Sequence, residues 1–230
     1  MVRYFDEELQ ELNKKLLQMS ALVEEAISRS VRALIERKAD LADKVIQTEE
    51  TVNLLEIEID ELCLKLLALR QPAAVDLRFI TSAMKMNNDL ERIGDLAVNI
   101  AECAQEIIRQ PLLKPLIDIP RMATLAQGMV KDSIDSLVTK DEELARYVCK
   151  RDDEVDNLND QIFRELLTYM MQDPKTTARA VELLLVGRHL ERIADHATNI
   201  AEDVIYFLKG KTIKHHVENR ESKNKGGESE

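Results

Sequence analysis

Apolar residues recur at steps of three and four along most of the chain, as Leu9, Leu12, Leu16 and Met19 do near its start. An α-helix has a period of 3.6 residues, so this spacing gathers the apolar side chains on one face and predicts long amphipathic helices. We expect six helices, over about residues 4–37, 40–69, 72–109, 120–138, 142–171 and 173–208.

Proline and aspartate mark the expected helix ends. Asp40 and Asp173 are expected N-caps, and Pro72 and Pro174 suit a first helical turn, where the missing N–H is not needed. Residues 110–120 contain three prolines in eleven positions. No helix accommodates that density, so this segment is expected to connect two halves.

The chain contains an internal repeat. LERIGDLAVNIAE (90–102) returns as LERIADHATNIAE (190–202) with the same residue at ten of thirteen positions, and apolar positions of the earlier helices match at an offset of 103. Three helices are the smallest set that buries each apolar stripe against two neighbours. We therefore expect an all-α fold of two tandem three-helix bundles, over 1–112 and 113–210, with a disordered tail over 211–230.

Each copy of the repeated motif carries a row of oxygen-bearing side chains. In the first copy, Glu91, Asp95 and Asn99 stand at i, i+4 and i+8, and Glu102 follows one turn later. These positions lie within about 80° of one another on a helix and opposite its apolar stripe. We expect them to point outward. The second copy repeats the row with Glu191, Asp195, Asn199 and Glu202.

The helix before each motif carries a second acidic row at similar spacing. Neighbouring rows would share one groove, where converging carboxylates repel unless they are protonated or bridged by hard cations. Two plainer interpretations compete, a solvated acidic face and local ion pairs of Arg92 and Arg192 with their preceding glutamates. The second rows are Glu49, Asn53, Glu56 and Asp60 in the first half, and Asp152, Asp156 and Asn159 in the second.

Composition narrows the functional classes. The net charge of −11 argues against nucleic-acid binding and is compatible with cations or a basic protein partner. No signal peptide or apolar run long enough for membrane insertion is present, and three scattered cysteines without a C-x-x-C pair fit thiols in a reducing cytoplasm. No Glu-x-x-His, Walker A, HExxH or G-x-S-x-G motif occurs, so nothing supports an enzyme. A metal-dependent hydrolase or metal-storage bundle is the alternative, and a plain helical scaffold a third.

Three stretches resemble the bacterial PhoU family of phosphate-uptake regulators: VNLLEIEIDELCLKLLALRQPAAVDLR (52–78), DLERIGDLAVNIAE (89–102) and ERIADHATNIAEDVIYFLKG (191–210). The resemblance covers about residues 1–210. It implies two three-helix bundles with E/D-x-x-x-D/N motifs that bind iron or zinc clusters in some members. The matching positions are Glu49, Asn53, Glu91, Asp95, Asp152, Asp156, Glu191 and Asp195. Asn53 is a weaker ligand than its counterpart Asp156, which predicts unequal sites.

The resemblance also implies a function. It predicts a cytoplasmic negative regulator without catalytic activity, which couples the ATPase subunit of the phosphate ABC transporter to a membrane sensor histidine kinase and represses phosphate-starvation genes. It further implies a homodimer that binds metal at the carboxylate motifs.

Overall fold

The computed structural model describes residues 2–211, with side chains from residue 5 onward, and this part of the chain forms six long helices and no strand. The all-α prediction is confirmed, and the helix bounds lie within a few residues of those expected. The expected disordered tail lies outside the described residues except for Lys211. The helices are α1 (Val2–Glu36), α2 (Ala39–Arg70), α3 (Ala74–Ile108), α4 (Asp118–Thr139), α5 (Glu142–Gln172) and α6 (Thr177–Lys209).

One of the two expected helix caps is found. The side chain of Asp173 accepts a hydrogen bond from the backbone N of Lys175, 3.0 Å away, and caps the short 3₁₀ helix Pro174–Thr176 that leads into α6. The prediction for Asp40 is wrong, because the cap residue of α2 is Lys38 and Asp40 lies inside the first turn. There the carboxylate is near the positive end of the helix dipole, which favours an acid equally well.

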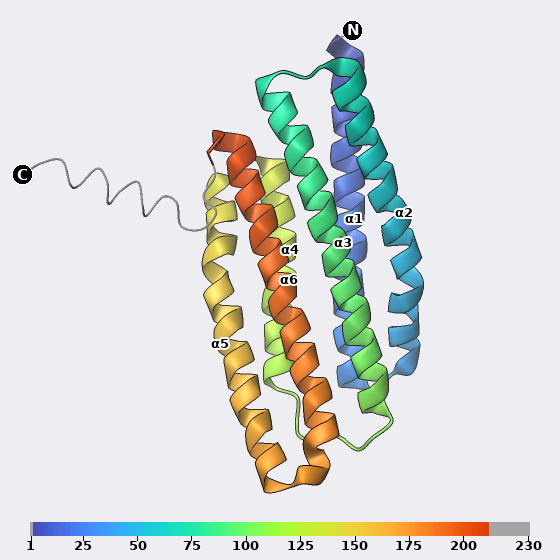
Figure 1. Ribbon diagram of the computed structural model, residues 1–230, viewed down its shortest axis with the longest axis vertical. Helices are drawn as coiled ribbons and strands as arrows, with labels where there is room; N and C mark the ends of the chain where they lie inside the picture. The colour runs from blue at the N-terminus through green and yellow to red at the C-terminus, as the bar shows by residue number, and fades with distance from the viewer. Residues whose placement is uncertain (1, 212–230) are drawn as a thin grey trace, which may run out of the picture.

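The six helices form two layers, which place α3 and α6 side by side at the centre of one face (Figure 1). On this face α5 and α2 flank them, while α4 and α1 lie behind. The start of α3 contacts the end of α6, since the rings of Phe79 and Phe207 are 5.4 Å apart and Nδ1 of His196 lies 2.8 Å from Oδ1 of Asp89. The two central helices are therefore antiparallel, and an approximate twofold axis between them relates the two halves.

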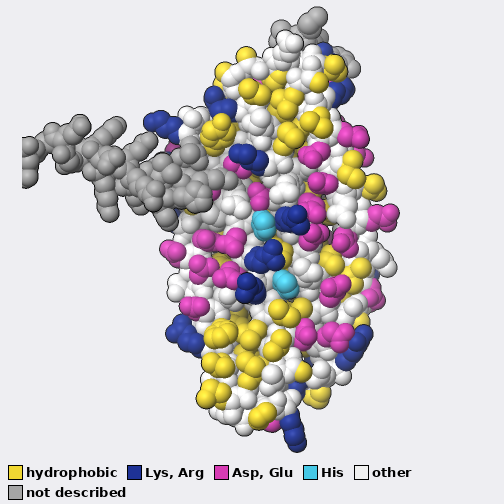
Figure 2. Space-filling model, in the orientation of Figure 1, with side chains coloured by type: hydrophobic (Ala, Val, Ile, Leu, Met, Phe, Trp, Pro, Cys, Tyr) yellow, Lys and Arg dark blue, Asp and Glu magenta, His cyan; other side chains and the backbone are white. Residues whose placement is uncertain are grey.

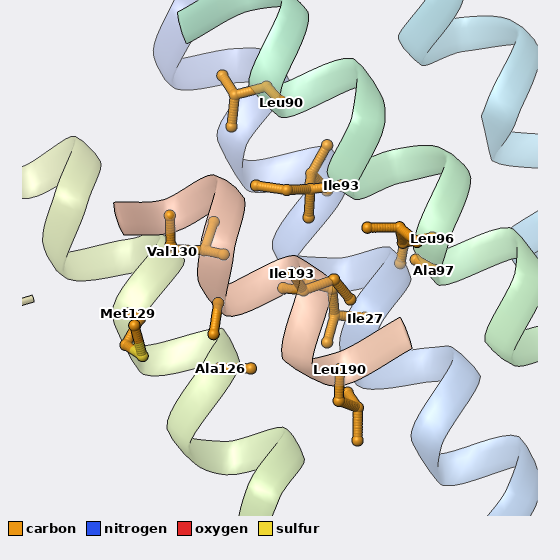
Figure 3. Packing of buried hydrophobic residues seen from close by; sticks show 14 of the residues in the cluster. Ile27, Leu90, Ile93, Leu96, Ala97, Ala126, Met129, Val130, Leu190 and Ile193 are labelled. Atoms are coloured by element: carbon orange, nitrogen blue, oxygen red, sulfur yellow. The ribbon is translucent and has the colours of Figure 1, made fainter. Parts of the chain in front are cut away.

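The two three-helix bundles share one hydrophobic core. Ile93 and Ile193, equivalent positions of the repeat, are both fully buried, and side chains of α1 and α4 meet them from behind (Figure 3). Burial of a side chain of this size stabilises the fold by about 1.5–3 kcal/mol. The core therefore spans the duplication, and the predicted two-bundle architecture is observed as one molecule.

The connector between α3 and α4 is fixed to both halves. Arg37, at the end of α1, donates hydrogen bonds to the carbonyl oxygens of Ile108 and Gln110, and Arg179 of α6 donates to that of Pro111. The expected boundary between residues 112 and 113 lies in this connector and stays a prediction.

No helix among residues 2–211 has an apolar stretch long enough to cross a membrane.

The three cysteines of the chain all lie among the described residues. Cys63, Cys103 and Cys149 are free thiols, and burial raises the pKa of each, to about 12, 12 and 11. Thiols that stay protonated are poor nucleophiles, as expected for structural cysteines.

Candidate metal centre

In the second half, α5 and α6 bring the four predicted carboxylates into one group. Burial is the main cause that raises the pKa values of Asp152, Asp156 and Asp195, and repulsion from Asp195 raises those of the other two further. Glu191 joins the group, since its pKa is raised first by burial and then by Asp156 and Asp195. Four members of the two acidic rows therefore lie near one another, while their assignment as metal ligands stays a prediction.

Asp152 is the most perturbed member of this group. Its pKa rises to about 6, because burial disfavours its charge and because Asp195 and Asp156 repel it. Its Oδ1 atom is buried and has no hydrogen-bond partner of standard geometry in the described residues, although the Thr198 hydroxyl lies close enough to lower the pKa of Asp152 against these effects. A buried oxygen without a donor costs free energy, and a bound cation would remove that cost.

Asn159 and Gly187 shape the other end of the group. The side chain of Asn159 lowers the pKa of Glu191 by hydrogen bonding, against the effect of burial. A methyl group at Gly187 would lie only 3.0 Å from Oδ1 of Asn159. The glycine therefore leaves the space in which the asparagine side chain reaches across from α5 to α6.

The first-half group is smaller and less acidic. Glu49 and Asn53 of α2 and Asp95 of α3 line a narrow pocket of about 10 Å³, which also borders Gly94. That volume corresponds to about one water-sized sphere. Three of the four predicted first-half residues therefore lie around one small space.

The fourth predicted residue, Glu91, lies beside this space. Its pKa is raised by burial and then by Asp95, and Glu56 contributes from α2. Nε of Arg92 lies 3.5 Å from Oε2 of Glu91, and its Nη1 lies 3.8 Å from Oδ2 of Asp95. The competing ion pair is thus present in the first half, although such long contacts at an exposed arginine contribute little stability. Arg192 forms no corresponding ion pair with described residues.

Three other motif residues lie at the α3–α6 interface. Asn199 donates a hydrogen bond to Asp89 across the α3–α6 interface, and Asn99 and Glu102 border a hollow of about 530 Å³ between the same two helices. Their spacing predicted that Asn99, Glu102 and Asn199 extend the acidic rows. They lie instead at the interface between α3 and α6. Thr198 was missed, although its position three residues after Asp195 on the same helical face was a usable signal.

The residues present fit a hard cation. All donors are carboxylate, amide or hydroxyl oxygens, the ligands that such ions prefer. Their mutual repulsion and the buried Oδ1 of Asp152 favour an ion in the second half. Among residues 2–211, however, no three His, Cys, Asp or Glu side chains are already placed to hold one ion together. Coordination would therefore require side-chain rotation, and the ligand assignment stays a prediction.

Comparison with known proteins identifies the family. The pattern described as the PhoU domain matches residues 16–104 and again residues 119–204. The chain is similar to the "Phosphate-specific transport system accessory protein PhoU homolog" of Aquifex aeolicus, at 43% identity over 208 residues that cover 90% of this chain and 94% of the relative. A homologue of the same description from Caulobacter vibrioides (strain NA1000 / CB15N) is 41% identical over 213 residues, which cover 92% and 93%.

Solved structures agree with the sequence matches. The crystal structure of PhoU from Pseudomonas aeruginosa superposes with a TM-score of 0.88 at 39% identity and covers 90% of this chain and 100% of that one. The phosphate transport system regulatory protein PhoU from Streptococcus pneumoniae gives a TM-score of 0.84 at 28% identity, covering 91% and 99%. With two matched PhoU domains and relatives above 40% identity over nine-tenths of its length, the chain belongs to the PhoU family.

Proposed function

We propose that the chain is a negative regulator of phosphate uptake and phosphate-starvation signalling. It acts in the cytoplasm as a non-catalytic adaptor between the ATPase subunit of the phosphate ABC transporter and a membrane sensor histidine kinase. The observation that carries this proposal is the family membership, since relatives spanning nearly the whole chain are described as accessory proteins of phosphate-specific transport.

Metal binding at the carboxylate groups is part of the proposal. The second-half group supports it most directly, because a cation would stabilise four mutually repelling carboxylates and the buried Oδ1 of Asp152. The resemblance names iron or zinc, and the oxygen-only donor set suits iron better than zinc, which usually takes nitrogen or sulfur ligands. A bound ion would neutralise the carboxylates and fix α5 against α6.

Deletion of the gene tests the regulatory role. In abundant phosphate, the deletion strain is expected to express phosphate-starvation genes that the parent strain represses, and the intact gene supplied in trans should restore repression. Unchanged expression in the deletion strain would count against negative regulation. Purified protein that hydrolyses a phosphoester or oxidises ferrous iron, with loss of that activity on changing Glu91 and Glu191, would overturn the adaptor role.

Elemental analysis tests the metal ligands. Protein purified without chelator is expected to carry at least one transition ion per half, and the double variant Asp95→Ala, Asp195→Ala should lose most of it. Asp135→Ala is the matched control, since Asp135 lies on α4 and pairs with Lys131 outside both groups. Equal metal content in the double variant, the control and the parent would show that the ligand assignment is wrong.

A further inference from the structure

An exposed apolar patch lies on the α5–α6 hairpin. Phe163, Leu167 and Met171 of α5 are 52%, 41% and 78% exposed and follow one another at i, i+4 and i+8. Val181 of α6 is 41% exposed on the facing helix. Side chains at this spacing form one stripe, and the patch exposes on the order of a few hundred Å², the size typical of functional patches. Figure 2 shows apolar side chains gathered at this end of the hairpin.

A second patch occupies the corresponding place on α2 and α3. Ile57 and Leu64 of α2 are 52% and 57% exposed, and Leu77 of α3 is 42% exposed. Leu64 and Leu167 are separated by 103 residues, the offset of the internal repeat. The approximate twofold axis between α3 and α6 therefore relates Leu64 to Leu167, while Phe163 corresponds to Asp60 and Met171 to Ala68. Figure 2 shows apolar side chains at opposite ends of the same face.

Each patch continues an acidic row. Asp160 precedes Phe163 on the same stripe of α5 and is exposed, outside the group of proposed metal ligands. Glu61, exposed on α2, lies between Ile57 and Leu64 in the first half. Basic side chains collect near the axis instead, where Arg188 and Arg192 are close enough to His189 to lower its pKa, after burial. The face thus has a basic centre, acidic side chains on its two flanks and apolar side chains at its two ends (Figure 2).

A second copy of this chain does not fit against this face when the centres of the two faces are placed opposite each other. Whichever way such a copy is turned, its basic centre would meet the basic centre of the first, and like charges would face each other across the interface. The complementary surface has acidic groups near its axis, Lys or Arg further out and apolar side chains at both ends. A homodimer presents such a surface twice about its own twofold axis.

We propose that the α2–α3–α6–α5 face docks a homodimeric protein, with one copy of this chain for each partner dimer and one half of the chain on each partner subunit. Apolar side chains of the partner cover the two patches, and its Lys or Arg side chains lie over Asp160 and Glu61. Taking the transporter's ATPase subunit or the sensor kinase as that partner rests on the proposed function.

Binding to the ATPase subunit of the phosphate transporter from the same genome, brought to its dimeric form with nucleotide, tests this surface. The cytoplasmic part of the sensor kinase is assayed in parallel. Light scattering is expected to give one chain per two partner subunits. Leu64→Lys and Leu167→Lys, at equivalent positions of the two halves, should each weaken binding about tenfold or more, as loss of a central apolar contact does. Circular dichroism checks that each variant keeps its helices.

Leu17→Lys is the matched control, because Leu17 is 40% exposed on α1, outside both patches, and its variant should bind like the parent. If the parent binds but both patch variants bind equally well, or if each partner subunit takes its own copy, the docking surface is wrong and the adaptor role stands. If neither partner binds the parent at all, both proposals fail. A dimer of the chain alone that Leu167→Lys dissociates would assign the patch to self-association and overturn the inference.

Discussion

Asp152→Asn measures what it costs to ionise Asp152 in the second-half group, first through burial and then through repulsion by its neighbours. The substitution keeps the size of the side chain and removes its charge. Burial and the neighbouring carboxylates raise the pKa of Asp152 from its ordinary 3.8 to about 6. At about 1.4 kcal/mol per pKa unit this corresponds to about 3 kcal/mol for a fully shielded group. Because Asp152 is partly exposed, solvent screening reduces the figure to about 1–2 kcal/mol.

The sign follows from proton linkage. Folded Asp152 holds its proton to higher pH than the unfolded chain does, so its ionisation lowers the free energy of unfolding as pH rises from about 4 to about 6. The Asp152→Asn variant has no carboxyl group at this position to ionise, so its free energy of unfolding does not fall for this reason. In chelator, we expect the variant to match the parent near pH 4 and to exceed its stability by about 1–2 kcal/mol above pH 6.5, a rise of about 2–8 °C in Tm.

Urea and thermal unfolding at a series of pH values, with chelator and then with Mn²⁺, provide the assay. The ion should stabilise the parent more than Asp152→Asn, since the variant has lost one carboxylate ligand. Glu49→Gln, at the equivalent first-half position beside Asn53 rather than an aspartate, is the control and should change the pH profile less. Parallel pH profiles for the parent and Asp152→Asn in chelator would refute the raised pKa of Asp152.

Three further substitutions test the packing that positions the site. Gly187→Ala should lower stability by about 1 kcal/mol or more and perturb metal content, because its methyl group would contact Oδ1 of Asn159 at 3.0 Å. Gly128→Ala should raise Tm, with about 0.5–1 kcal/mol of added stability, because the nearest atoms, 3.4 Å away, belong to the flexible end of Arg151 and alanine favours the helix. Ile193→Ala should cost about 2–5 kcal/mol in chemical denaturation, since the side chain is fully buried where the two halves meet.

A contrary result for any of the three variants would contradict the packing described above. A Gly187→Ala variant as stable as the parent would show that Asn159 moves aside without cost. Loss of stability in Gly128→Ala would mean that the Arg151 side chain cannot move away from the added methyl group. A change below about 1 kcal/mol for Ile193→Ala would show that Ile193 is not tightly packed where the two halves meet.

Periodicity alone predicted the helices, because each one buries a stripe of its own residues and the spacing of that stripe is written in the sequence. The repeat of 90–102 at 190–202 likewise predicted the duplicated bundle and the outward acidic rows. The sequence could not place Asp40 correctly, since several residues near a helix start can act as caps and the choice depends on the turn before it.

Local sequence patterns could not predict which residues of the two halves contact each other. Asp89 and His196 are 107 residues apart, and no periodicity links them. The same applies to Asn159 and Gly187, whose fit depends on how closely α5 approaches α6. Asn53 in place of an aspartate already predicted unequal acidic groups, and tertiary packing adds to the difference through the contact of Arg92 with Glu91 and through the burial of Oδ1 of Asp152.

The sequence by itself determined which side chains lie on each helical face, because that depends only on the geometry of a single helix. The tertiary structure decided which faces meet, since helices distant in sequence approach one another only through the shared core. That packing set the antiparallel pairing of α3 and α6, and with it the arrangement of two apolar patches and two carboxylate groups about one axis on a single face.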